Sequence, residues 1–174
     1  PALNVSTVPM RRAYRAGEPV NFLATWNYPQ WIDAAEIRIL DARADGTAAP
    51  LEILAVGLDG VATWTMPELN AGENLLYVLR VYDREGRFDE TKPLTLAQSR
   101  NALKQHEQDG PEIAPGHGED RTAFRNIPVE GGALTVYGRH VPNGHRVTAL
   151  GEDVPVDAEG AFVIQRIVPP GDHA

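Results

Sequence analysis

The chain contains no cysteine, which excludes disulfide bridges, thiolate nucleophiles and cysteine-ligated metal sites. It also has no run of about 18 apolar residues, the length that a membrane-spanning helix needs. Membrane insertion by this sequence is therefore not expected. The lack of cysteine does not decide the compartment, because exported proteins as well as cytosolic ones can fold without disulfides.

Serine and clustered positive charge are scarce. Ser6 and Ser99 are the only serines, and neither lies in the G-x-S-x-G pattern of a hydrolase nucleophile. Asp and Glu outnumber Lys and Arg by 24 to 16, which gives a formal net charge of −8. A nucleic acid is therefore not expected as a partner, because its phosphates attract basic surfaces.

The five histidines do not follow the spacing of a metal site. His140 and His145 flank a predicted turn, and the other three lie in polar or terminal segments without a His-x-x-x-His or similar pattern. We predict no cofactor, no metal and no catalytic residue. The acidic turns do not match a calcium-binding loop either, although calcium between domains is left open.

The first part of the chain, residues 1–97, alternates apolar and polar residues with a period of two. In "VNFLATWNY" (20–28) the aromatic and apolar side chains share one face, and "AEIRIL" (35–40) repeats the pattern. Further short runs at 3–8, 51–56, 58–67, 74–83 and 86–97 are separated by turn residues. This spacing predicts seven strands in an antiparallel β-sandwich.

The run "NLLYVLRVYD" (74–83) is the most apolar of these segments. Alternation places Leu75, Tyr77, Leu79 and Val81 on one face, so Tyr77 is predicted to be a core residue whose hydroxyl needs a partner. Together with "FLATWNY", "AEIRI" and "GRFDETKPLTL", this run resembles a fibronectin type III or related immunoglobulin-like module. The resemblance implies that Tyr77 forms a corner with upstream backbone and that Trp26 belongs to an early core strand.

The next segment, residues 98–124, is polar, rich in Gly and Pro, and without period-two alternation, so it is predicted to be a linker. Within it, "QSRNALKQHEQ" (98–108) favours a short helix capped by Ser99.

Residues 125–174 return to β-type patterns with compact turns, and predict four strands of a second, smaller β-domain. Their inward pairs are predicted to be Leu134 and Val136, Val147 and Ala149, Val154 and Val156, and Phe162 and Ile164. We expect this domain to lack its last strand and the sequence to belong to a longer chain. The expected fold is therefore all-β, with two antiparallel immunoglobulin-like β-sandwich domains joined by a polar linker.

The second domain resembles the repeated modules of large OmpA-family envelope proteins of proteobacteria. Those modules carry "N-I-P-V-x-G-G-x-L-T-V-x-G", then "V-P-x-G-x-x-V" and "P-P-G-x-H". The matching positions here are residues 126–129, Gly131, Gly132, residues 134–136, Gly138, Val141, Pro142, Gly144, residues 169–171 and His173. The resemblance implies a periplasmic or outer-membrane-associated location, but it carries over no barrel and no peptidoglycan-binding domain.

Aromatic residues give the candidates for ligand binding. Trp31 follows "YPQ" at the end of a predicted strand, where its ring and that of Tyr28, or of Tyr14, could stack on a sugar. The alternative is that Trp31 closes one end of the sandwich.

The function expected from these patterns is non-catalytic: structural or interaction modules that act as spacers or docking surfaces in a bacterial envelope protein. Their partners are expected to be envelope proteins, bound in part by addition of a strand. Two alternatives stay open at this point, namely a carbohydrate- or peptidoglycan-binding module and the accessory domains of a hydrolase.

Overall fold

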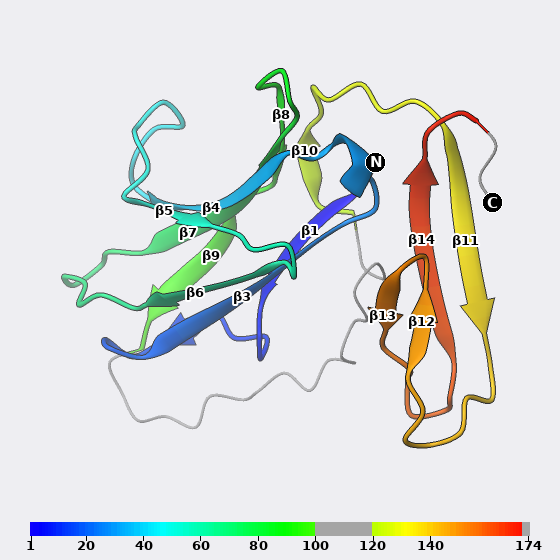
Figure 1. Ribbon diagram of the computed structural model, residues 1–174. Coiled ribbons are helices and arrows are strands. Elements are labelled where there is room, and N and C mark those ends of the chain that lie inside the picture. Colours follow the sequence, from blue (N-terminus) through cyan, green and yellow to red (C-terminus); the bar gives the residue numbers. More distant parts are fainter. Residues whose placement is uncertain (100–119, 172–174) are drawn as a thin grey trace.

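The computed structural model describes residues 1–99 and 120–171 (Figure 1). Within these ranges the repeated structure consists of strands, with a single 3-10 turn, η1 (Pro29–Trp31). The all-β class expected from the sequence is therefore confirmed. Among the described residues, no helix has the length and apolar character needed to cross a membrane. The predicted helix of residues 98–108 lies almost wholly outside the described residues.

Within residues 1–99 and 120–127, ten strands form the N-terminal part of the molecule. They are β1 (Leu3–Thr7), β2 (Ala13–Tyr14), β3 (Pro19–Trp26), β4 (Ala34–Asp41), β5 (Glu52–Ala55), β6 (Val61–Thr65), β7 (Leu75–Tyr82), β8 (Phe88–Thr91), β9 (Leu94–Gln98) and β10 (Thr122–Phe124). Each of the seven segments predicted between residues 3 and 97 contains a strand at the expected place.

These strands make two sheets that pack face to face. The smaller sheet has the order β1-β3-β6, and the larger has the order β10-β8-β7-β4-β5, with β9 pairing with both β7 and β2. All of the pairings are antiparallel except that of β2 with β9. We call this unit, which comprises residues 1–99 and 120–127, the N-terminal sandwich.

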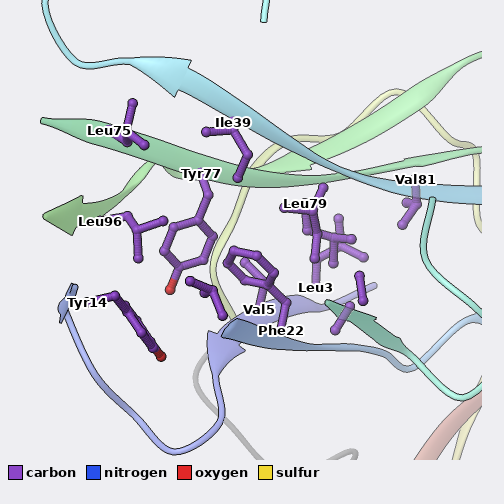
Figure 2. Close-up of a cluster of buried hydrophobic side chains, with 14 of the residues drawn as sticks. Leu3, Val5, Tyr14, Phe22, Ile39, Leu75, Tyr77, Leu79, Val81 and Leu96 are labelled. Carbon is purple, nitrogen blue, oxygen red and sulfur yellow. The ribbon is translucent and has the colours of Figure 1, made fainter. Parts of the chain in front are cut away.

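The core of the N-terminal sandwich lies between its two sheets (Figure 2). Every second residue of β7 points inward, as the alternation predicted, and Leu79 and Val81 are completely buried. From the opposite sheet, Val5 and Phe22 meet them. Each large apolar side chain buried in this way contributes roughly 1.5–3 kcal/mol to folding.

Tyr77 lies in this core, as predicted, with only 5% of its surface exposed. Its ring packs on that of Phe22 with the centroids 5.1 Å apart, and the two rings lie side by side in Figure 2. Burial raises the pKa of Tyr77 to about 12. Its hydroxyl makes no hydrogen bond with residues 1–99 or 120–171, so the corner implied by the fibronectin resemblance is not formed within these ranges.

The segment of residues 86–97, predicted as one strand, is in fact two strands, β8 (Phe88–Thr91) and β9 (Leu94–Gln98). The break falls at Lys92 and Pro93, because proline has no N–H with which to continue a ladder. Both halves gain a further neighbour, since β10 pairs with β8 and β2 pairs with β9. The segment is therefore interior to the sheet rather than at its edge.

The end of the predicted linker also differs from the expectation. Residues 122–124 form β10, which pairs antiparallel with β8, with Thr122 opposite Thr91 and Phe124 opposite Glu90. The strand, Thr-Ala-Phe, is only three residues long, so a period of two cannot be recognised in its sequence. Residues 122–124 form a strand because they pair with β8.

Four strands form the C-terminal part, as predicted. They are β11 (Gly132–Gly138), β12 (Val147–Ala149), β13 (Glu152–Val154) and β14 (Phe162–Val168). β11 pairs with β14 over all seven residues without a shift in register, and β12 pairs with β13 in a separate two-stranded sheet. We call residues 132–168 the C-terminal hairpins; they stand beside the N-terminal sandwich in Figure 1.

The C-terminal hairpins bury few side chains. Of the residues predicted to point inward, Val154 and Ile164 are each 5% exposed, whereas Leu134 is 40% exposed. Tyr137 is 74% exposed. The immunoglobulin-like sandwich expected for this part stays a prediction, because the described strands form two separate pairs.

Candidate functional site

A buried carboxylate, Asp89 of β8, joins the N-terminal sandwich to the segment that leads into the C-terminal hairpins. Asp89 is completely buried. Its Oδ2 accepts a hydrogen bond of 2.6 Å from the Tyr28 hydroxyl, and its Oδ1 accepts bonds from the backbone N–H groups of Asn126 (2.6 Å) and Ile127 (2.9 Å). Three donors thus satisfy a charge that would otherwise be costly to bury.

This junction holds residues 120–127 on the sandwich. Ile127 is 5% exposed and belongs to the core cluster between the sheets. On the N-terminal side, the backbone N–H of Arg121 donates to the carbonyl of Leu3 at 2.8 Å. Farther along the chain, the N–H of Ile167 donates to the carbonyl of Asn27 at 2.6 Å. The C-terminal hairpins are therefore connected to the sandwich through the chain that follows Ile127 and through this bond of Ile167.

Tyr28 was predicted to bind a ligand, and the structure places it in this junction instead. Its side chain is completely buried, so neither face of its ring is available for stacking. Burial, together with the hydrogen bond to Asp89, raises the pKa of Tyr28 well above its usual value. Tyr14, the other tyrosine considered for stacking, is also buried, at 1% exposure.

Trp31, the second predicted ligand-binding residue, ends η1 and is partly buried. It packs against the core cluster, as expected of a residue that closes one end of a sandwich. The structure does not bring Trp31 and Tyr28 together as a shared aromatic platform.

A cleft of about 620 Å³ lies between the N-terminal sandwich and the C-terminal hairpins. The sandwich contributes the end of β3, the start of β4 and the loop between β5 and β6, and the hairpins contribute β13 and β14. The volume falls within the range of ordinary ligand pockets. We call this space the junction cleft.

The junction cleft is lined by both apolar and acidic side chains. Trp26, Ile32 and Val56 line it while packing against the core cluster, and Ile164 closes the hairpin side. Among the described residues, the lining carboxylates are those of Asp33, Asp59, Glu152 and Asp153, and the one lining cation is Arg166. The sequence predicted Trp26 as a core residue only, because alternation within a strand cannot show that a distant hairpin leaves a space beside it.

Gly60 shapes one wall of the junction cleft. Its φ of +77° is in the left-handed region, and a Cβ built there would lie 2.2 Å from the carbonyl oxygen of Ala24. Its own carbonyl accepts a hydrogen bond of 2.8 Å from the N–H of Ala24. The loop between β5 and β6 therefore lies directly against β3 because this residue has no side chain.

A second candidate site is the unpaired edge of β11. Within the described residues β11 pairs with β14 alone, so its other edge is left without a strand partner. Its sequence, GALTVYG, contains no charged residue and no proline, which are the features that usually protect a strand edge.

The outer face of the larger sheet is less available, because its side chains are occupied with one another. Arg80 forms an ion pair of 2.7 Å with Glu90, and its guanidinium lies 4.0 Å from the centre of the Phe88 ring. The Tyr82 hydroxyl donates to Glu36 at 2.8 Å. This face is therefore not the first choice for a ligand site.

The described residues contain no group of three or more His, Asp or Glu side chains arranged to hold a metal ion. No family model matches the chain, and a comparison with curated proteins finds no relative. The resemblances to fibronectin type III modules and to OmpA-family envelope proteins therefore stay predictions.

Proposed function

We propose that this chain is a non-catalytic interaction module of a bacterial cell-envelope protein, which docks a protein partner by adding that partner's strand to β11. The observation that carries the proposal is the unpaired, uncharged edge of β11. A strand added there would extend the β11–β14 sheet through backbone hydrogen bonds, and side-chain pockets on either face would give selectivity.

The exposure of β11 side chains supports this role. Tyr137 and Leu134 present apolar surface beside the unpaired edge, at 74% and 40% exposure. An isolated two-stranded sheet is marginally stable, whereas a third strand with an apolar face adds stability. Binding of a partner strand would therefore both satisfy the edge and cover these two side chains.

Other strand edges are less suited to the same role. The edge of β1 is partly occupied, at Leu3, whose N–H donates to the Thr122 hydroxyl at 2.9 Å and whose carbonyl accepts from the N–H of Arg121. β5 carries Glu52 and is four residues long. β6 is uncharged but shorter than β11, and it is followed directly by Met66 and Pro67.

A structural rather than catalytic role is supported by how the buried polar groups are used. Asp89 and Tyr28 bond to each other and to backbone, which leaves neither of them to bind or react with a substrate. The order β1-β3-β6 facing β5-β4-β7-β8 supports the immunoglobulin-like assignment. The envelope location rests on the motifs of residues 126–173 and stays a prediction.

The strand-addition proposal is tested with a peptide that copies Phe162–Val168, the natural neighbour of β11, flanked by glycine and serine for solubility. β11 presents the same side chains to a strand on either edge, so this sequence should also fit the unpaired edge. We expect saturable binding by calorimetry, and slower hydrogen exchange at β11 amides in NMR spectra of the intact chain.

The control peptide has the same sequence with alternate backbone amides N-methylated, which removes the donors along one edge and should abolish binding. Equal binding of both peptides, or protection at β6 in place of β11, would show that strand addition at β11 is not how this chain takes a partner.

A further inference from the structure

The junction cleft has a charge balance that selects for one class of ligand. In the part of the chain that the structure describes, four carboxylates line it, against the one guanidinium of Arg166. That guanidinium is already engaged: its Nη2 lies 2.5 Å from Glu152 Oε1, and its Nη1 donates to the carbonyl of Leu150 at 2.8 Å. Arg166 and Glu152 thus neutralise each other, and three acidic side chains are left to act on a ligand.

These three carboxylates are accessible from the cleft. The carboxylate of Asp33 makes no hydrogen bond or ion pair with any described residue, and its side chain is exposed. Asp59 uses one oxygen to accept from the N–H of Val61 at 3.0 Å, which leaves the other. Asp153 is 69% exposed; its Oδ1 accepts a bond of 3.2 Å from the Thr148 hydroxyl, and the contact of its Oδ2 with Arg146, at 3.9 Å, is long.

The apolar side chains that line the cleft suit the aliphatic part of a charged side chain. Trp26 and Ile32 come from the sandwich and Ile164 from β14, so a ligand between them would touch both parts of the molecule. An indole ring in the same lining as carboxylates also favours a cation, because the face of the ring carries negative charge. A neutral sugar would use the ring but leave the carboxylates without a counter-charge.

We propose that the junction cleft binds a basic peptide segment, with a lysine or arginine side chain lying along Trp26 and Ile32 and its cationic group held by Asp33 and Asp59. The site is distinct from the β11 edge and does not depend on strand addition there. The net charge of −8 would also attract such a segment from a distance at low ionic strength.

The test is a titration of the intact chain with a blocked Ala-Lys-Ala-Lys-Ala peptide, followed by NMR shifts of the Trp26 indole and the Ile164 methyl groups. We expect saturable shifts at both residues, and binding that weakens as salt is added because the contacts are ionic. The same peptide with Nε-acetylated lysines should not bind.

The variant Asp33→Asn combined with Asp59→Asn should weaken peptide binding by about tenfold, since each exposed carboxylate contributes a few-fold. Asp45→Asn is the matched control: Asp45, like Asp59, accepts a bond from the backbone N–H two residues on, but it lies outside the cleft lining. It should change the affinity by less than about twofold. The side-chain oxygen of an asparagine can still accept the hydrogen bond from the backbone N–H two residues on. Both variants should therefore unfold at the same temperature as the parent chain.

Two further ligands separate the alternatives. Spermidine that binds more tightly than the peptide would reassign the cleft to free polyamines, and a neutral N-acetylglucosamine oligomer that shifts the same residues would reassign it to glycans. Either result overturns the proposal, as does peptide binding that is unaffected by the Asp33 and Asp59 changes. None of these outcomes bears on strand addition, which is measured with a different peptide at β11.

Discussion

At the scale of the residue, Asp89 shows how a single side chain can connect distant parts of a chain. It accepts hydrogen bonds from a residue 61 positions before it and from two residues 37 and 38 positions after it. Its local sequence, "RFDETK", suggests an ordinary solvated strand. The strand nevertheless buries every second residue, because Asp89 and Thr91 both have 0% exposure.

The replacement Tyr28→Phe should lower the free energy of unfolding by about 1–3 kcal/mol, because it leaves Asp89 Oδ2 buried without its donor. Asp89→Ala should cost more, since it removes the acceptor of three donors and leaves a cavity. Chemical denaturation followed by circular dichroism measures both changes.

Tyr137→Phe is the matched control for Tyr28→Phe, because the side chain of Tyr137 is 74% exposed. It should change stability by no more than about 0.5 kcal/mol. If Tyr28→Phe is equally neutral, the Asp89 junction does not stabilise the fold in the way that we describe.

At the scale of the element, the strands were largely predictable and their neighbours were not. Alternation located β3, β4 and β7 because each has one face in the core and one outside it. It could not show that β2 lies parallel to β9, because two residues have no period. β10 was missed for the same reason, and its neighbour β8 lies more than 30 residues away in the sequence.

The loop between β5 and β6 provides an element-scale prediction. Gly60→Ala should lower the free energy of unfolding by about 2–3 kcal/mol, because the new methyl group would collide with the carbonyl of Ala24 in a left-handed conformation. The loop would move away from β3 and widen the junction cleft.

Gly72→Ala is the control for backbone strain alone. Gly72 has a φ of +81°, but a Cβ there would meet no atom within 4 Å. It should cost only about 1 kcal/mol. Thermal denaturation compares the two variants, and equal costs would mean that the contact between Gly60 and β3 contributes nothing.

At the scale of the whole molecule, the core is unevenly distributed. The buried cluster is formed almost entirely by residues of the N-terminal sandwich, and the C-terminal hairpins add only the partly buried Ile167 to it. The hairpins themselves bury Val154 and Ile164. The sandwich therefore has the core of an independent domain, and the hairpins depend on what they contact.

A chain ending at residue 128 should therefore fold and unfold cooperatively. Its free energy of unfolding should be lower by about 2 kcal/mol, because the part of the core cluster that Val129 and Ile167 cover would be exposed to water. A chain of residues 129–174 should show no cooperative transition, because separate strand pairs are too small to be stable. Circular dichroism and NMR dispersion measure both, and a folded 129–174 would contradict this division.

The sequence by itself determined the all-β class, the positions of most strands, the inward faces of the N-terminal strands and the burial of Tyr77, because a strand exposes its two faces with a period that is visible locally. Only the tertiary structure decided that Tyr28 is a structural residue bound to Asp89, that residues 120–127 belong to the sandwich, and that Trp26 borders an acidic cleft. These features depend on which distant segments meet, and a hydrogen bond or a cleft between them leaves no periodic signal in either segment.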